Sequence, residues 1–156
     1  MESSKMGNYF EDFIVGDMIK HSLSKTIFES DNNFFSLITM NHHPVHTNID
    51  YCKTEKYKKP LVVGTLVFSL AVGITVPDIS GKAIANLMYE TIDHLAPVFI
   101  NDTIYVKTKI LEKRVSKSKP SQGIVYVESI AYNQNDIDVL RFRRKVLVKL
   151  REKYDR

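Results

Sequence analysis

The densest group of side chains that could carry out chemistry lies in the segment Asn41–His46, which holds three of the five histidines of the chain. Pro44 breaks a helix and pushes the backbone of His43 towards an extended conformation. The segment is therefore predicted to be a loop that can project imidazoles into a cleft. His46 comes just before a predicted helix, whose positive end favours a neutral imidazole. A neutral imidazole can accept a proton from water, so His46 is a candidate general base.

Two other interpretations of these histidines remain open at this point. They could be ordinary solvated side chains of a surface loop. They could also bind zinc, but His42 and His43 are neighbours that point apart, and no Cys, Asp or Glu nearby completes a recognisable ligand pattern. We therefore predict no metal site.

Helices are expected on both sides of this loop. Ser30 is a candidate N-cap for a helix over Asp31–Thr39, and Asn48 or Asp50 is a candidate N-cap for a helix containing Tyr51–Tyr57. The loop would then be held between two helical segments.

The most apolar stretch of the chain, Leu61–Val76, is predicted to be a buried helix beginning near Gly64. It is shorter than the roughly 20 residues that span a bilayer, so no membrane insertion is expected. A helix that is apolar almost all round needs cover on every side.

From Lys82 onward the hydrophobic pattern has a period of two, which predicts β-strands. The alternation is clearest over Ile104–Ile110. Ile124–Tyr132 and Ile137–Leu150 are also expected to be extended, and the turn residues between them predict a hairpin. The chain is therefore predicted to have an α+β fold, with one antiparallel sheet wrapped around one long helix.

These motifs resemble the MaoC-like hydratases and dehydratases. That family carries aspartate-x-Asn-Pro-x-His-x-aspartate, then Tyr-Ala, then Pro-(Ile/Leu)-Val-His-Gly at the start of a buried helix. This sequence keeps the order and spacing, and segments near both ends of the match are also similar. The corresponding segments are Asn41–Asn48, Tyr51–Cys52, Pro60–Gly64, Asn8–Asp17 and Ala96–Thr103.

The resemblance implies a single hotdog domain over residues 1–156, a homodimer or higher homo-oligomer, and an acyl-CoA substrate. Members add or remove water across the 2,3 double bond of the thioester. His46 matches the family's catalytic His, and Gly64 matches the residue whose backbone N–H receives the thioester oxygen. That role is chemically sensible, because N–H groups at a helix N-terminus stabilise a developing anion. Coenzyme A enters as part of the substrate, and no separate cofactor is expected.

The sequence departs from the family pattern at the third catalytic position, where Asn41 replaces the usual Asp. An amide cannot take a proton from water but can orient it. Proton transfer would then depend on His46, with His43 or an acidic residue from elsewhere in the chain as a candidate helper. The neighbouring residues are similar to a subgroup associated with mesaconyl-CoA hydration, which favours an active enzyme. The alternatives are an acyl-CoA-binding protein without catalysis and a hotdog thioesterase.

Composition limits the possible partners. The 156 residues carry 22 basic and 18 acidic side chains, a small excess that permits phosphate-bearing ligands. No zinc-finger or RNA-recognition motif is present, so no nucleic-acid partner is expected. The single Cys52 cannot form an internal disulfide, and Met1–Phe10 lacks the apolar stretch of a secretory signal, so a cytoplasmic location is expected.

Basic residues alternate along the last predicted strand and are expected to form a solvated outer face. A second interpretation is that some of them, or the lysines of Lys107–Lys109 or Tyr57–Lys59, meet the phosphates of coenzyme A. The strand residues are Arg141, Arg143, Lys145, Lys149 and Arg151.

Overall fold

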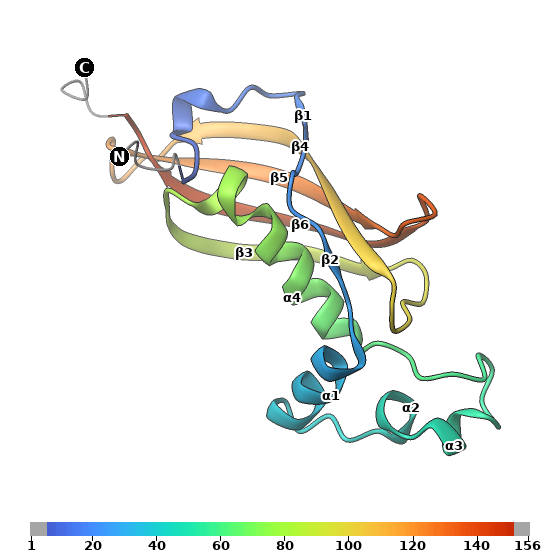
Figure 1. The fold of residues 1–156 in the computed structure, drawn as a ribbon. Coiled ribbons are helices and arrows are strands. Elements are labelled where there is room, and N and C mark those ends of the chain that lie inside the picture. Colours follow the sequence, from blue (N-terminus) through green and yellow to red (C-terminus); the bar gives the residue numbers. More distant parts are fainter. Residues whose placement is uncertain (1–5, 152–156) are drawn as a thin grey trace, which may run out of the picture.

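The computed structural model describes residues 6–151, which form one antiparallel sheet folded around a central helix (Figure 1). The strand order is β1-β4-β5-β6-β3, and β2 pairs with β4 beside β1. The predicted α+β arrangement is confirmed. The strands are β1 (Met18–Lys20), β2 (Lys25–Thr26), β3 (Ala83–His94), β4 (Thr103–Val115), β5 (Gln122–Tyr132) and β6 (Asp138–Lys149).

The three long strands β4, β5 and β6 follow the predicted period of two. In β4, Ile104, Val106 and Ile110 are buried on the face that meets the helix. The predicted hairpin is present, since β5 and β6 pair along their whole length. Asp136 in the connecting turn has a positive φ of 58°, a conformation that Asp tolerates better than most residues.

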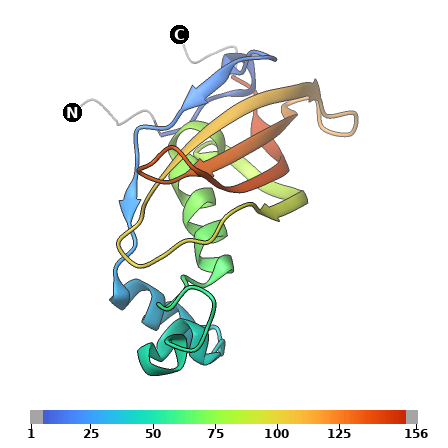
Figure 2. The same ribbon diagram turned by 90° about the vertical axis from the view of Figure 1, so that its right-hand side faces the viewer.

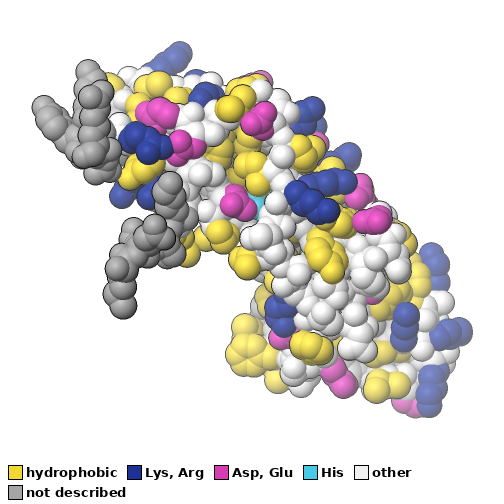
Figure 3. Space-filling model, turned by 45° about the horizontal axis from the view of Figure 1, so that its top comes forward, with side chains coloured by type: hydrophobic (Ala, Val, Ile, Leu, Met, Phe, Trp, Pro, Cys, Tyr) yellow, Lys and Arg dark blue, Asp and Glu magenta, His cyan; other side chains and the backbone are white. Residues whose placement is uncertain are grey.

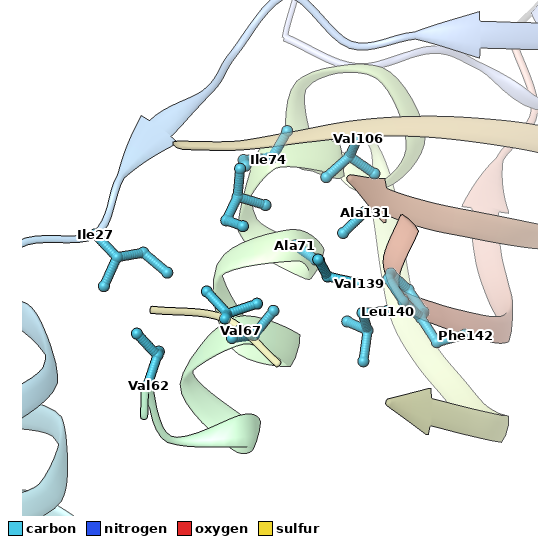
Figure 4. Close-up of a cluster of buried hydrophobic side chains, with 12 residues drawn as sticks. Ile27, Val62, Val67, Ala71, Ile74, Val106, Ala131, Val139, Leu140 and Phe142 are labelled. Atoms are coloured by element: carbon cyan, nitrogen blue, oxygen red, sulfur yellow. The ribbon is translucent and has the colours of Figure 1, made fainter. Parts of the chain in front are cut away.

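The predicted buried helix is α4 (Gly64–Thr75), and it begins at the expected glycine. Val67, Ala71 and Ile74 recur at helical spacing and point into the sheet, where they pack against side chains such as Leu140 and Phe142 (Figure 4). A single turn of π-helix, η2 (Val76–Ser80), follows α4.

The expectation that α4 is covered on every side is wrong for the single chain. Thr65, Ser69 and Gly73 on the opposite side are exposed, and Leu66 and Val72 are only partly buried. The sheet curves round one side of the helix only. The remaining side is free in one copy of the chain.

Three further helices form a lobe at the N-terminal end of α4, below the sheet (Figures 1 and 2). They are α1 (Glu29–Ile38), α2 (Pro44–Thr47) and α3 (Ile49–Cys52), and the short turn η1 (Phe10–Asp12) lies near the start of the chain.

The caps of these helices differ in part from expectation. Helix α1 begins before Ser30, because the Asp31 carboxylate accepts the N–H of Phe28, so Ser30 is not its N-cap. Asn48 does cap α3 by accepting the N–H of Tyr51 at 2.9 Å. That helix ends at Cys52, well short of Tyr57.

Three of the basic residues predicted for the outer face of the sheet are paired with acidic side chains. Arg141 pairs with Asp93, Arg143 with Glu128, and Lys145 with Glu90. On the face seen in Figure 3, basic side chains are interleaved with acidic and apolar ones and do not merge into one patch. Within residues 6–151, no helix is long and apolar enough to cross a membrane.

Candidate active site

A buried amide, Asn32 of α1, ties the helical lobe to the start of α4. Its Nδ2 donates to the backbone oxygens of His46 and Leu61, at 3.0 and 3.2 Å. Its Oδ1 accepts the N–H of Val63 at 2.9 Å. The side chain is 1% exposed and satisfies three backbone groups at once. Asn32 therefore sets the position of His46 relative to α4, a role that sequence reasoning missed.

The prediction that His46 lies in a loop before a helix is wrong, because Pro44 occupies the first position of α2, where its missing N–H costs nothing, and His46 lies within this short helix. The imidazole of His46 has a defined orientation. Nδ1 is 2.9 Å from the carbonyl oxygen of Leu61. A carbonyl can only accept, so Nδ1 carries the hydrogen, and Nε2 of the neutral ring is left as a proton acceptor. This is the protonation pattern that a general base requires.

Gly64 is the first residue of α4, where backbone N–H groups have no partner inside the helix. The N–H of Val63 is taken by Asn32. Among the described residues the N–H of Gly64 has no acceptor. It is therefore available to a ligand at the positive end of a helix of 12 residues.

A second histidine, His94 at the end of β3, lies directly against Gly64. A Cβ placed on Gly64 would be 2.9 Å from Cε1 of the His94 ring and 3.2 Å from its Nε2. Only a glycine leaves room for the imidazole there. Sequence reasoning missed His94, although it lies only two residues before the Ala96–Thr103 segment that resembles the family.

Two cavities meet at His46. One has a volume of about 430 Å³, contains His46, Gly64 and His94 in its wall, and is otherwise mainly apolar. The other, of about 600 Å³, is lined by His46 with polar residues that include Lys58 and Lys59. His46 therefore lies between a mainly apolar space and a more polar one, which carries Glu29 as well as the two lysines.

The other two residues expected at the site do not line either cavity. His43 uses Nδ1 to accept the N–H of Val45 at 3.1 Å, so it caps α2, and its ring centroid is 6.3 Å from that of His46. Asn41 is half-buried after Met40, which has a φ of 60°. The structure thus brings His46 and Gly64 together, and leaves Asn41 and His43 outside the walls of both cavities.

Cys52 is fully buried, with Sγ 3.4 Å from the carbonyl oxygen of Val45. It fills the core of the helical lobe and lines neither cavity.

A second buried polar cluster lies at the other end of α4. His21 donates from Nδ1 to Asp78 at 2.6 Å, and its Nε2 is 2.7 Å from the hydroxyl of Thr108, which also contacts Ser129. Burial lowers the pKa of His21, while the Asp78 carboxylate opposes that shift. The ring is therefore held neutral, and Nε2 accepts the Thr108 hydroxyl.

Arg144 lies near this cluster and is 2% exposed. It donates to the hydroxyl of Thr75 at 2.7 Å, and burial lowers its pKa. Neither His21 nor Arg144 lines the cavities at His46. Arg144 links β6 to α4, and His21 links β4 to η2.

Comparison with protein families matches residues 12–133 to a model described as a MaoC-like domain. A β-methylmalyl-CoA dehydratase of Chloroflexus aurantiacus is 34% identical over 94% of this chain and 41% of its own length. A mesaconyl-CoA hydratase of Cereibacter sphaeroides is 29% identical over 94% of this chain and 42% of its own length. The chain thus spans about two fifths of these curated relatives. The resemblance expected from the sequence is confirmed.

Solved structures agree on the fold. A putative MaoC domain dehydratase from Chloroflexus aurantiacus superposes with a TM-score of 0.91 at 32% identity, covering 100% of this chain and 44% of that one. A Mycobacterium tuberculosis protein described as having a double hotdog fold gives a TM-score of 0.86 at 22% identity, covering 96% of this chain and 46% of its own. The predicted hotdog fold is confirmed.

Proposed function

Since the chain belongs to the family of MaoC-like domains, we propose that it adds water to the 2,3 double bond of an enoyl-CoA thioester, or catalyses the reverse dehydration. The observation that carries this proposal is the meeting of the His46 imidazole and the N–H of Gly64 in one cavity. The names of the relatives, a dehydratase and a hydratase of CoA thioesters, support the same chemistry.

In the proposed mechanism, the thioester oxygen accepts a hydrogen bond from the N–H of Gly64. Attack of water on the β-carbon moves negative charge onto that oxygen, and the helix N-terminus stabilises it. Nε2 of His46 takes the proton of the attacking water, while the hydrogen bond from Nδ1 to Leu61 keeps the ring oriented. These steps use groups of the chain only, and coenzyme A enters as part of the substrate.

The two cavities suggest how the substrate is oriented. We assign the acyl group to the apolar cavity beside Gly64 and the coenzyme A portion to the cavity with Lys58 and Lys59. Lysine ammonium groups attract phosphates as point charges. The thioester, which joins the two portions, would then lie at His46.

We propose that the active form is a homodimer that joins through β3. This strand is an edge of the sheet, and its apolar side chains are unusually exposed, Ile84 at 43%, Leu87 at 47% and Met88 at 42%. An exposed apolar edge favours pairing with another chain. A second copy could also cover the free side of α4. The relatives that are more than twice as long, one of them a double hotdog, support a paired arrangement.

One screen separates hydration from its rivals. The protein is incubated with a panel of acyl-CoA and enoyl-CoA thioesters, including branched dicarboxylic ones, while double-bond absorbance and free thiol are recorded together. Hydration lowers the absorbance without releasing thiol. Release of thiol would identify a thioesterase, and binding without either change would identify an acyl-CoA-binding protein.

A further inference from the structure

Hydration of an enoyl thioester requires two proton movements. One proton leaves the water that attacks the β-carbon, and another must reach the α-carbon. His46 can accept the first. Asn41, at the position where the family has an Asp, carries an amide that neither gives nor takes a proton. A second acid beside the α-carbon would complete the addition without the return of the proton held by His46.

His94 is in the right place for that movement. Its ring lies against Gly64, close enough that a Cβ there would be 2.9 Å from Cε1. A thioester whose oxygen accepts the N–H of Gly64 would lie in the cavity that His94 also lines, with its α-carbon one bond from the carbonyl carbon. His46 is in the wall of the same cavity of about 430 Å³. The two imidazoles thus face one space from different elements, α2 and β3.

Few other charged groups reach this space. Its titratable lining residues, within the described part of the chain, are His46, His94 and Tyr57. Asp93, the neighbour of His94 along β3, pairs with Arg141 at 3.0 Å. Successive side chains of a strand point to opposite faces, so that ion pair lies on the other face of the sheet. In β6, the residue paired with His94 is the apolar Leu140.

We propose that His94 is a second catalytic acid of this site and delivers the proton to the α-carbon. This inference rests on the proposed hydration. Neutral His46 takes a proton from water as the water oxygen bonds to the β-carbon, and the π electrons of the double bond move onto the thioester. Protonated His94 then gives its proton to the α-carbon as the thioester carbonyl re-forms. His46 releases its proton to solvent and His94 takes one up, which restores both residues.

The test compares the wild-type protein with His94→Gln, using the best enoyl-CoA found in the screen. Gln keeps an N–H donor in the cavity but cannot transfer a proton. The expected loss of kcat is between about 10²-fold and 10⁴-fold, the usual contribution of general acid–base catalysis. KM and the affinity for a saturated acyl-CoA should change little. His42→Gln, an exposed histidine outside both cavities, is the matched control and should keep wild-type turnover.

The dependence of kcat/KM on pH provides a second measurement, which a purely structural role of His94 would leave unchanged. A general base and a general acid that act together give kcat/KM a bell-shaped dependence on pH, so the wild-type value should fall at both low and high pH. His94→Gln should lack the fall at high pH. Turnover of His94→Gln within tenfold of wild type, or an unchanged profile at high pH, would overturn the role of His94 while leaving hydration intact. A wild-type protein that hydrates no thioester of the panel would overturn the proposed function and this inference with it.

Discussion

The imidazole of His94 occupies the space that any side chain at Gly64 would need, with Cε1 2.9 Å from the place of a Cβ. This contact explains the glycine at the start of α4 without invoking backbone strain. It also predicts an unusual consequence of Gly64→Ala. Alanine has a better helix propensity by about 1 kcal/mol, and the exposed His94 ring can swing aside. Stability should therefore hold, while turnover falls at least about tenfold because both groups at the thioester are displaced.

Gly73→Ala is the matched control for that change. Gly73 lies in the same helix, and a Cβ there meets nothing within 4 Å. It should raise the free energy of unfolding by up to about 1 kcal/mol and leave turnover unchanged. Equal turnover of Gly64→Ala and Gly73→Ala would contradict the role of the His94–Gly64 contact.

Removal of the His46 imidazole should separate catalysis from binding. His46→Ala is expected to lower kcat by about 10²-fold to 10⁴-fold, with little change in acyl-CoA affinity, because the proton acceptor is lost and the cavity remains. Asn41→Asp should be tolerated, since Asn41 lines neither cavity and Asp is the family residue there. Steady-state kinetics of the two variants test both expectations. Undiminished hydration by His46→Ala would show that His46 takes no part in the mechanism.

Asn32→Ala should destabilise the protein by about 2–3 kcal/mol. The change leaves the N–H of Val63 without its acceptor in a buried place, and such groups cost about 1–3 kcal/mol each. Urea unfolding measures this loss of stability. The m-value, which is the dependence of the free energy of unfolding on urea concentration, should stay unchanged. Asn33→Ala, the exposed neighbour on α1, should stay within about 0.5 kcal/mol of wild type. Similar losses for the two variants would show that Asn32 does not hold the lobe in place.

Stability should decline as the pH falls through the range in which His21 titrates. The pKa of His21 in the folded protein lies below its usual value of 6.5, mainly because of burial. The unfolded chain therefore binds a proton more readily, so the contribution of neutral His21 is complete above about pH 6.5 and is lost as the pH falls towards the folded pKa. Urea unfolding of the wild-type protein at a series of pH values from about 8 to about 5 should show this decline in the free energy of unfolding.

The variant His21→Gln should have a flatter pH dependence over the same range, because the titrating group is gone. It should also be less stable than wild type near neutral pH, since the contacts to Asp78 and Thr108 are weakened. A His21→Gln slope as steep as that of wild type would assign the pH dependence to other groups.

A charge on the exposed edge should disrupt the proposed dimer. Met88→Lys places an ammonium in the middle of β3, where it would have to be buried between two copies. Sedimentation at micromolar concentration should give twice the chain mass for wild type and the single chain mass for Met88→Lys. Ile14→Lys, 60% exposed and outside β3, should remain dimeric. A wild-type monomer at these concentrations would remove the proposed interface.

The sequence alone determined the features that depend on local periodicity and spacing. Alternation identified the long strands β4, β5 and β6, and continuous apolar character identified α4 and its start at Gly64. The family motif placed His46 near that start. Each of these is a relation between residues close together in the chain, where backbone preference and side-chain pattern act directly.

Only the tertiary structure decided which distant residues share the site. Asn32 has no special pattern in α1, and its three hydrogen bonds exist because two other segments fold onto it. His94 is far from Gly64 in sequence, and strand β3 brings its ring to the helix N-terminus. The same holds for the free side of α4, since the pattern that predicts an apolar helix carries no information about which neighbours cover it. Such relations arise from packing between elements, which no local period of the sequence encodes.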